Sequence, residues 1–199
     1  MEQEIINFIN LYLNSQTNNR FKAFEKMREI FINNYNKNNN EDVAISLYAY
    51  LANWGMMHNS VLMTHNNFVC LKDIVALLYS FFPILNNYNP ISNNSHVNDL
   101  FILIDDLKIE LRKLHVTPTD TLVSKIILGT LGCMPAYDRN VKGGLSKIGV
   151  PQSLTKSGFN QLLIKAQSLD LDPKHYVGLY SNILPLYTEM RMLDMYLFI

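Results

Sequence analysis

The chain of 199 residues has few cysteines, no excess of charge of either sign and no long apolar run. Its two cysteines, Cys70 and Cys133, are too few for a disulfide framework and too far apart for the close thiolate pair of a zinc site. Lysine plus arginine equals aspartate plus glutamate at 17 each, so no overall basic field attracts nucleic acid. The longest apolar-rich stretch, residues 74–85, is too short to span a bilayer.

Signals for cofactors, metals and export are also missing. The eight glycines form no glycine-rich phosphate loop, so we expect no nucleotide cofactor. His58 and His65 are two helical turns apart, but a metal ion would need a third ligand, and we predict no metal site. The first residues, MEQEIINFIN, place acids before the apolar run, unlike the basic start of a signal peptide. We therefore expect a soluble, cytoplasmic protein that does not bind membranes.

What the sequence does contain is helical periodicity. Apolar residues make up 48% of the chain and recur at spacings of three and four, and no segment shows the alternation of a β-strand. The expected helices cover residues 5–13, 21–31, 43–54, 68–82, 96–114, 123–131, 137–148 and 154–168. Pro83 is expected to end the fourth of these, and residues 33–40 and 86–94 read as polar loops. The fold prediction is all-α: a single compact domain of eight to ten helices over residues 1–199.

One segment, residues 119–152, reads TDTLVSKIILGTLGCMPAYDRNVKGGLSKIGVPQ and carries the sharpest pattern. Residues 117–121, which overlap its start, supply hydroxyls and a carboxylate that suit a helix start, with a proline allowed in the first turn. The helix ends at Gly132, and a short apolar-proline connector turns the chain. Asp138 then stands at the start of the next helix, where the helix dipole and free N–H groups favour a carboxylate. A helix cap alone would also explain this aspartate.

This pattern resembles the helix-hairpin-helix DNA glycosylases, the superfamily that includes the endonuclease-III-like enzymes. In that family a helical hairpin is followed by a glycine, an apolar-proline connector and a catalytic aspartate that opens the next helix. The matching positions over residues 115–150 are Gly132, Pro135, Tyr137, Asp138, Val141 and Gly149. The resemblance implies an all-α glycosylase-like fold and makes Asp138 the catalytic residue, stabilising an oxocarbenium-like sugar after the base is flipped out of the duplex.

The sequence departs from the family pattern in the hairpin. The family usually has two glycines in the hairpin turn, whereas residues 115–118 contain none and include a proline, which lacks an amide donor. The position of the family's lysine nucleophile falls near Asp120, and no four-cysteine cluster is present. The resemblance therefore implies a monofunctional enzyme, which would release a base without cutting the strand.

The other candidate residues divide into two groups. Substrate contacts are expected from Trp54, His58, Tyr137 and Asn140, and contacts to the nucleic-acid backbone from Thr117, Thr119, Lys125, Arg139 and Lys142. Residues 112–156 contain seven positive side chains and two acids, so this segment is locally basic by five charges. Such a segment is suited to binding phosphates, and DNA is the expected partner.

Two other interpretations remain open from the sequence. The chain is also consistent with a non-catalytic helical binding or regulatory module, for example a defence-related factor, that keeps the shape without the chemistry. A weaker alternative is a small-molecule pocket at residues 54–60, where the single tryptophan adjoins a glycine, two methionines and a histidine. The apolar C-terminal stretch, residues 187–199, packs either on the body of the protein or on a second copy, which would make a homodimer through the C-terminal helix.

Overall fold

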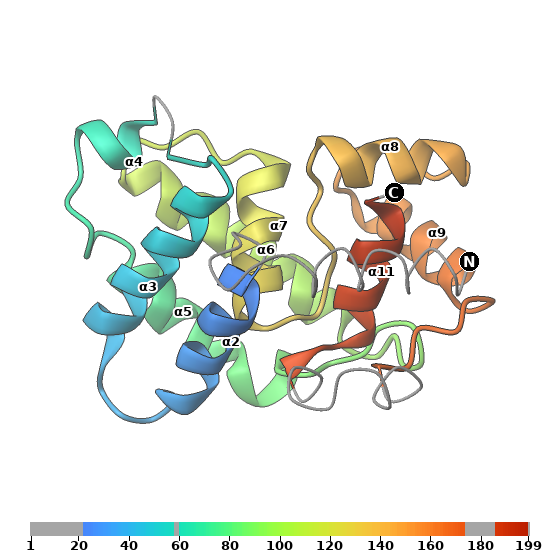
Figure 1. The fold of residues 1–199 in the computed structure, drawn as a ribbon, viewed down its shortest axis with the longest axis horizontal. Coiled ribbons are helices and arrows are strands. Elements are labelled where there is room, and N and C mark those ends of the chain that lie inside the picture. The colour runs from blue at the N-terminus through green and yellow to red at the C-terminus, as the bar shows by residue number, and fades with distance from the viewer. Residues whose placement is uncertain (1–21, 58–59, 174–185, 199) are drawn as a thin grey trace.

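The computed structural model describes residues 22–57, 60–173 and 186–198, and over these residues the protein is a single compact all-α domain without strands (Figure 1). Nine helices are found in the described part of the chain. They are α2 (Ala23–Asn33), α3 (Asn40–Asn53), α4 (Val61–Thr64), α5 (Lys72–Leu85), α6 (Val97–Lys113), α7 (Asp120–Thr130), α8 (Arg139–Lys147), α9 (Lys156–Ala166) and α11 (Glu189–Leu197). The all-α prediction is confirmed, and the expected helix over residues 5–13 lies outside the described residues.

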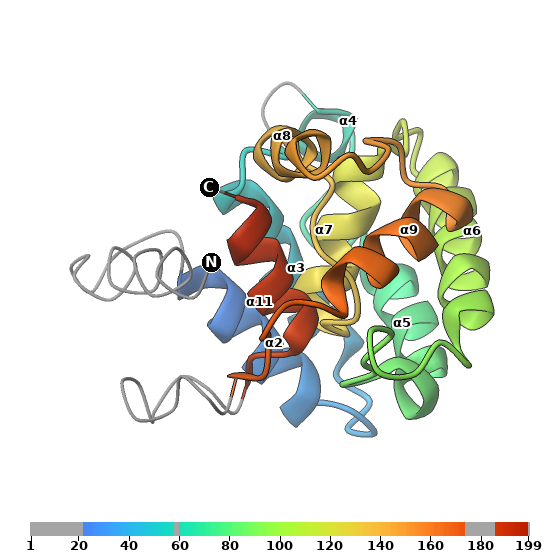
Figure 2. The same ribbon diagram turned by 90° about the vertical axis from the view of Figure 1, so that its right-hand side faces the viewer.

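Helix α7 lies in the middle of the molecule. Figures 1 and 2 show it between a group formed by α2, α3, α5 and α6 and a group formed by α8, α9 and α11. Every residue from Leu122 to Thr130 is buried, so this helix has no solvent-facing side over most of its length. Gly129 permits the close packing, because a Cβ there would stand 2.5 Å from a ring carbon of Tyr50 on α3. Side chains on α7 are therefore held by packing from all directions.

The loops follow the expected pattern, with one correction in α5. Residues 34–39 and 86–96 connect helices, close to the two polar tracts predicted from the sequence. Pro83, however, does not end α5, which continues to Leu85. A proline in the last turn removes a single helix hydrogen bond, and burial of Leu85 in the core compensates for it.

Helix α11 packs within its own chain. Its apolar residues Met190, Met192, Leu193, Met195 and Leu197 are all buried in the single protomer. Thr188 caps its start by accepting a hydrogen bond from the amide of Arg191, and also donates to the carbonyl of Gly132 at 2.6 Å. Packing within the protomer accounts for these apolar residues, and the homodimer through this helix stays a prediction.

Candidate functional site

Helices α6 and α7 form a helical hairpin, joined by residues 114–119. His115 adopts a left-handed conformation with φ of 59°, and the Asn66 side chain donates to the carbonyl of Leu114 at 3.3 Å. Thr119 caps α7, because its hydroxyl accepts from the amide of Leu122 at 3.2 Å. The amide of Thr119 donates to the carbonyl of Thr117 at 3.0 Å. Both threonines are exposed, but the Thr119 amide is already used within the turn.

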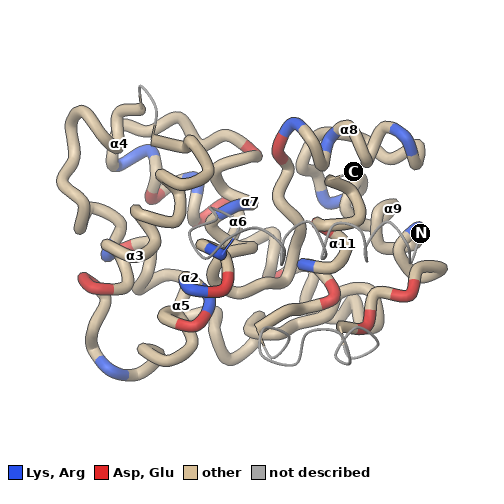
Figure 3. Tube along the Cα trace, in the orientation of Figure 1, with Lys and Arg blue, Asp and Glu red and all other residues tan. Residues whose placement is uncertain are grey.

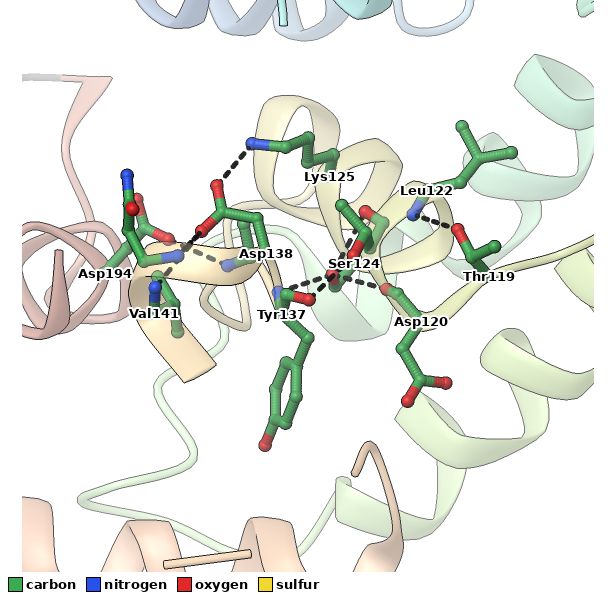
Figure 4. A network of polar contacts seen from close by, with 12 residues as sticks. Thr119, Asp120, Leu122, Ser124, Lys125, Tyr137, Asp138, Val141 and Asp194 are labelled. Atoms are coloured by element: carbon green, nitrogen blue, oxygen red, sulfur yellow. Dashed lines mark hydrogen bonds and ion pairs between the residues drawn. The ribbon is translucent and has the colours of Figure 1, made fainter. Parts of the chain in front are cut away.

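The connector between α7 and α8 is fixed on both sides (Figure 4). Gly132 leaves α7 with φ of 68°, a backbone conformation that other residues rarely adopt. The amide of Tyr137 donates to the Ser124 hydroxyl at 2.7 Å, and the amide of Ala136 donates to the Asp194 carboxylate at 2.8 Å. The connector is therefore tied to α7 and to α11, and these bonds determine where the next residue, Asp138, is placed.

Asp138 is the N-cap of α8, and both of its carboxylate oxygens have partners. Oδ1 accepts from the amides of Asn140 at 3.0 Å and Val141 at 3.1 Å. Oδ2 accepts from the ammonium of Lys125 at 2.8 Å. The cap predicted from the sequence is thus present, and the carboxylate also meets a lysine from the central helix.

Lys125 lies in the interior. Its side chain is 6% exposed, and its ammonium stands 4.5 Å from the centre of the Trp54 ring, within the range of a cation–π interaction. Instead of facing a nucleic-acid backbone, as the sequence suggested, this lysine faces a carboxylate and an aromatic ring. A lysine so enclosed cannot reach a phosphate on the protein surface.

A small cavity borders Asp138 and Lys125. Its lining comes from α3, α7, α8 and α11 and from residues next to them: Tyr50, Trp54, Lys125, Leu128, Asp138, Arg191, Asp194 and Phe198. The cavity volume is about 10 Å³, which is the room needed by a single water molecule. Two carboxylates, two cations and three aromatic rings therefore surround a space that admits little more than water in this conformation.

The second ion pair of the cavity, on α11, was missed by the sequence reasoning. Arg191 donates to Asp194 at 2.6 Å, and both side chains are buried. Burial raises the pKa of Asp194, while Arg191 opposes that effect. Burial alone would lower the pKa of Arg191, but the Asp194 carboxylate raises it. The only sequence signal was a pair of opposite charges three residues apart within an apolar stretch.

The structure brings some of the predicted residues to Asp138 and not others. Trp54 lines the cavity, whereas the Tyr137 ring is buried and points away from Asp138 (Figure 4). The Tyr137 hydroxyl has no partner among the described residues. Asn140 is exposed in the first turn of α8, so its side chain does not line the cavity. His58 lies outside the described residues.

The predicted cations on α8 are at the surface. Figure 3 shows lysine and arginine positions along this helix, beside the acid at its start. Arg139 is exposed and Lys142 is partly exposed, as a contact to a phosphate backbone requires. Within the described residues, no group of three or more His, Cys, Asp or Glu side chains is placed to hold a metal ion. None of the described helices combines the length and apolar character that a membrane span demands.

A partly buried carboxylate at a helix start, with an ammonium on one side and room for a water beside it, is an arrangement able to activate water or stabilise a nearby positive charge. Comparison of the chain with protein-family models, with curated proteins and with solved structures finds no match.

Proposed function

We propose that the protein is a DNA-binding base-excision protein, similar to a monofunctional glycosylase, in which Asp138 acts on the sugar of a flipped-out nucleotide. One observation carries the proposal: the Asp138 carboxylate is fixed at the start of α8 and borders a cavity with room for a water, walled by Trp54 and Tyr50. The helical hairpin α6–α7 and the connector that precede Asp138 have the order that the resemblance implies.

The reaction would be hydrolysis of the N-glycosidic bond. The bond between the sugar C1′ and the base nitrogen breaks, and its electron pair leaves with the base. The Asp138 carboxylate stabilises the resulting oxocarbenium-like sugar, and a water beside it attacks C1′. Asp138 accepts the proton of that water, and the departing base finally takes up a proton from solvent. Atoms and charge balance without a cofactor.

Strand cleavage is not part of the proposal. The start of α7, where a lyase of this superfamily would carry its amine, has Asp120. The Asp120 carboxylate accepts from the amide of Leu154 at 3.0 Å, so it has a local structural role. Lys125 forms an ion pair with Asp138, and an ammonium group is not a nucleophile.

Substrate entry requires a change at the cavity wall. A nucleobase does not fit into about 10 Å³, so binding must enlarge the space beside Asp138. Phe198, at the end of α11, is the cavity residue closest to the C-terminus and belongs to the last turn of that helix. We place the opening at this turn, because Phe198 follows the end of α11, whereas Tyr50, Trp54, Lys125 and Leu128 line the cavity from or beside the core helices α3 and α7.

The deciding experiment measures binding and base release with the same proteins. Duplexes carrying an abasic-site analogue, a panel of damaged bases or no lesion are incubated with wild type and Asp138→Asn. We expect a preference for the analogue in both proteins and base release by wild type alone, reduced about a hundredfold or more in the variant. Asp105→Asn is the matched control, since Asp105 is 74% exposed on α6 and remote from the cavity lining. Release that is equal in wild type and Asp138→Asn would refute the catalytic role.

A second candidate function is a non-catalytic helical binding or regulatory module, for example a defence-related factor, that keeps the shape without the chemistry. Two features favour it. Both carboxylate oxygens of Asp138 already accept hydrogen bonds from the protein, and the cavity has no room for anything larger than water. Preference for the abasic analogue without release of any base would support this candidate. Absence of binding to every duplex at low salt would exclude DNA as the partner, remove the first candidate and leave the helical binding module.

A further inference from the structure

Lys125 is the only charged side chain that α7 buries along its central length. Its neighbours in that helix are apolar or small, and Lys125 itself is 5% exposed. Burying an ammonium is unfavourable unless it has charged or polar partners, and a well-packed apolar residue of similar volume is often equally or more stabilising. Packing alone therefore does not account for a lysine at this position.

The surroundings of Lys125 contain two carboxylates. Asp138 and Asp194 line the same small cavity, together with Arg191 and Tyr50. Two carboxylates in one poorly solvated space disfavour each other's charge, and one of them then tends to hold a proton. Each carboxylate here has its own cation: Lys125 lies 2.8 Å from Asp138, and Arg191 lies 2.6 Å from Asp194.

We propose that Lys125 is a positioning residue whose ammonium pairs with the Asp138 carboxylate and orients it beside Asp194. The catalytic importance of Lys125 rests on the proposed function, but the effect of its charge on Asp138 can be tested without DNA. The ammonium fixes Oδ2 while the α8 amides fix Oδ1, so the carboxylate has one orientation toward the cavity. Without the ammonium, Asp138 shares the cavity with Asp194 and is left with amide donors alone.

The fluorescence of Trp54 reports directly on the ion pair between Lys125 and Asp138. Trp54 is the only tryptophan of the chain, and its ring lies 4.5 Å from the Lys125 ammonium. Protonation of Asp138 removes the partner of that ammonium, so intrinsic fluorescence is expected to change with pH. The component of the fluorescence titration that disappears in Asp138→Asn belongs to Asp138, which separates it from the titration of other groups.

The test compares two substitutions of the lysine. Lys125→Met keeps most of the side-chain volume and removes the charge, and Lys125→Arg keeps the charge. We expect the Asp138 component of the Trp54 titration to move upward by about one pH unit or more in Lys125→Met and to stay close to wild type in Lys125→Arg. Circular dichroism establishes that both variants are folded. An unchanged midpoint in Lys125→Met would overturn the proposal.

A second measurement covers the case in which Lys125→Met does not fold. Lys125→Ala is titrated with n-butylammonium, which carries the missing ammonium on an alkyl chain, and Trp54 fluorescence and melting temperature are followed. Restoration in Lys125→Ala, and none in Lys125→Ala/Asp138→Asn, supports the positioning role. Equal effects of the amine on both proteins would contradict it.

The outcomes separate this inference from the proposed function. If the fluorescence titration shifts in Lys125→Met but the wild-type protein releases no base, the positioning role of Lys125 is supported and the proposed catalytic function is refuted. In a protein that does release a base, we expect the pH profile of release in Lys125→Met to move in the same direction as its fluorescence. Trapping of Lys125 on DNA by borohydride would show a nucleophilic lysine and overturn the positioning role.

Discussion

At the scale of single residues, three helix caps can be compared because only one of them also faces a buried charge. Thr119, Thr155 and Asp138 each accept from amides in the first turn of a helix. We expect Thr119→Ala and Thr155→Ala to lower the free energy of unfolding by about 1 kcal/mol each. Asp138→Ala is expected to lower it by about 3 to 5 kcal/mol, because the buried ammonium of Lys125 loses its carboxylate. Urea unfolding measures all three, and a similar loss for the three variants would argue against the buried ion pair.

The two thiols are expected to react at very different rates. Burial raises the pKa of Cys133 to about 12 from an ordinary value of 9.0. At pH 8 a thiol with the ordinary pKa is about one-tenth ionised, whereas Cys133 is about one ten-thousandth ionised, and only the thiolate reacts. Burial also raises the pKa of Cys70, but this thiol is partly accessible.

Iodoacetamide labelling followed by peptide mass spectrometry measures this difference. Cys70 is expected to be alkylated first in the native protein, and the reaction of Cys133 should require denaturant or a pH well above 9. Native-state alkylation of Cys133 at the rate of Cys70 would show that the connector is not packed as described.

The residue-scale predictions from the sequence succeeded where the signal was local. The Asp138 and Thr119 caps depend on neighbouring residues, and both are present. Lys125 is expected to contact a nucleic-acid backbone because it belongs to the locally basic segment, residues 112–156, but the structure buries it. Its partner is 13 residues away across the connector, and a pairing created by that turn has no periodic signature in the sequence.

At the scale of helices, adjacent glycines in α8 have opposite roles. A Cβ at Gly143 would meet nothing within 4 Å, whereas a Cβ at Gly144 would collide with the backbone carbonyl of Leu197 in the last turn of α11. Gly143→Ala is therefore expected to stabilise the protein by about 0.5 to 1 kcal/mol through helix propensity. Gly144→Ala is expected to destabilise it by about 1 to 3 kcal/mol, because the two helices must separate.

Thermal and urea unfolding of the two alanine variants test this contact. Each variant is the control for the other, since the substitution and the helix are the same. If both alanines had the same effect, α8 and α11 would not be in backbone contact at Gly144, and the cavity wall at Phe198 would lose its support.

Helix positions were largely predictable because apolar spacing reports which face of a helix is buried. Helices α6, α8 and α9 lie within the segments expected from that spacing, and α7 begins three residues before its expected segment, 123–131. The spacing does not show which helices contact one another. The buried pair Arg191–Asp194 and the closure of the cavity by α11 depend on contacts between distant segments, and neither leaves a local pattern.

At the scale of the whole molecule, zero net charge conceals an uneven distribution. Figure 3 shows cations gathered along α8, and the exposed ones next to the candidate site are Arg139 and Lys142. In the locally basic segment, residues 112–156, fewer cations can contact a phosphate than the sequence predicts, because Lys125 is internal and Lys113 pairs with Glu110 at 2.6 Å. A phosphate-binding surface at α8 would thus be small, and DNA affinity would depend on a few contacts.

This distribution predicts how DNA binding varies with salt. Each phosphate contact adds about −0.9 to the slope of log affinity against log salt concentration, so a few contacts on α8 imply a slope of about −2 to −3. Arg139→Gln and Lys142→Gln are each expected to make the slope shallower by about one. Lys37→Gln is the matched control, since Lys37 is exposed in the α2–α3 connection, far from α8 (Figure 1). Fluorescence anisotropy of a labelled duplex between low and physiological salt gives all four slopes. An equal change in the three variants would show that attraction is not localised at α8, whereas a change confined to the α8 variants would place the DNA backbone beside Asp138.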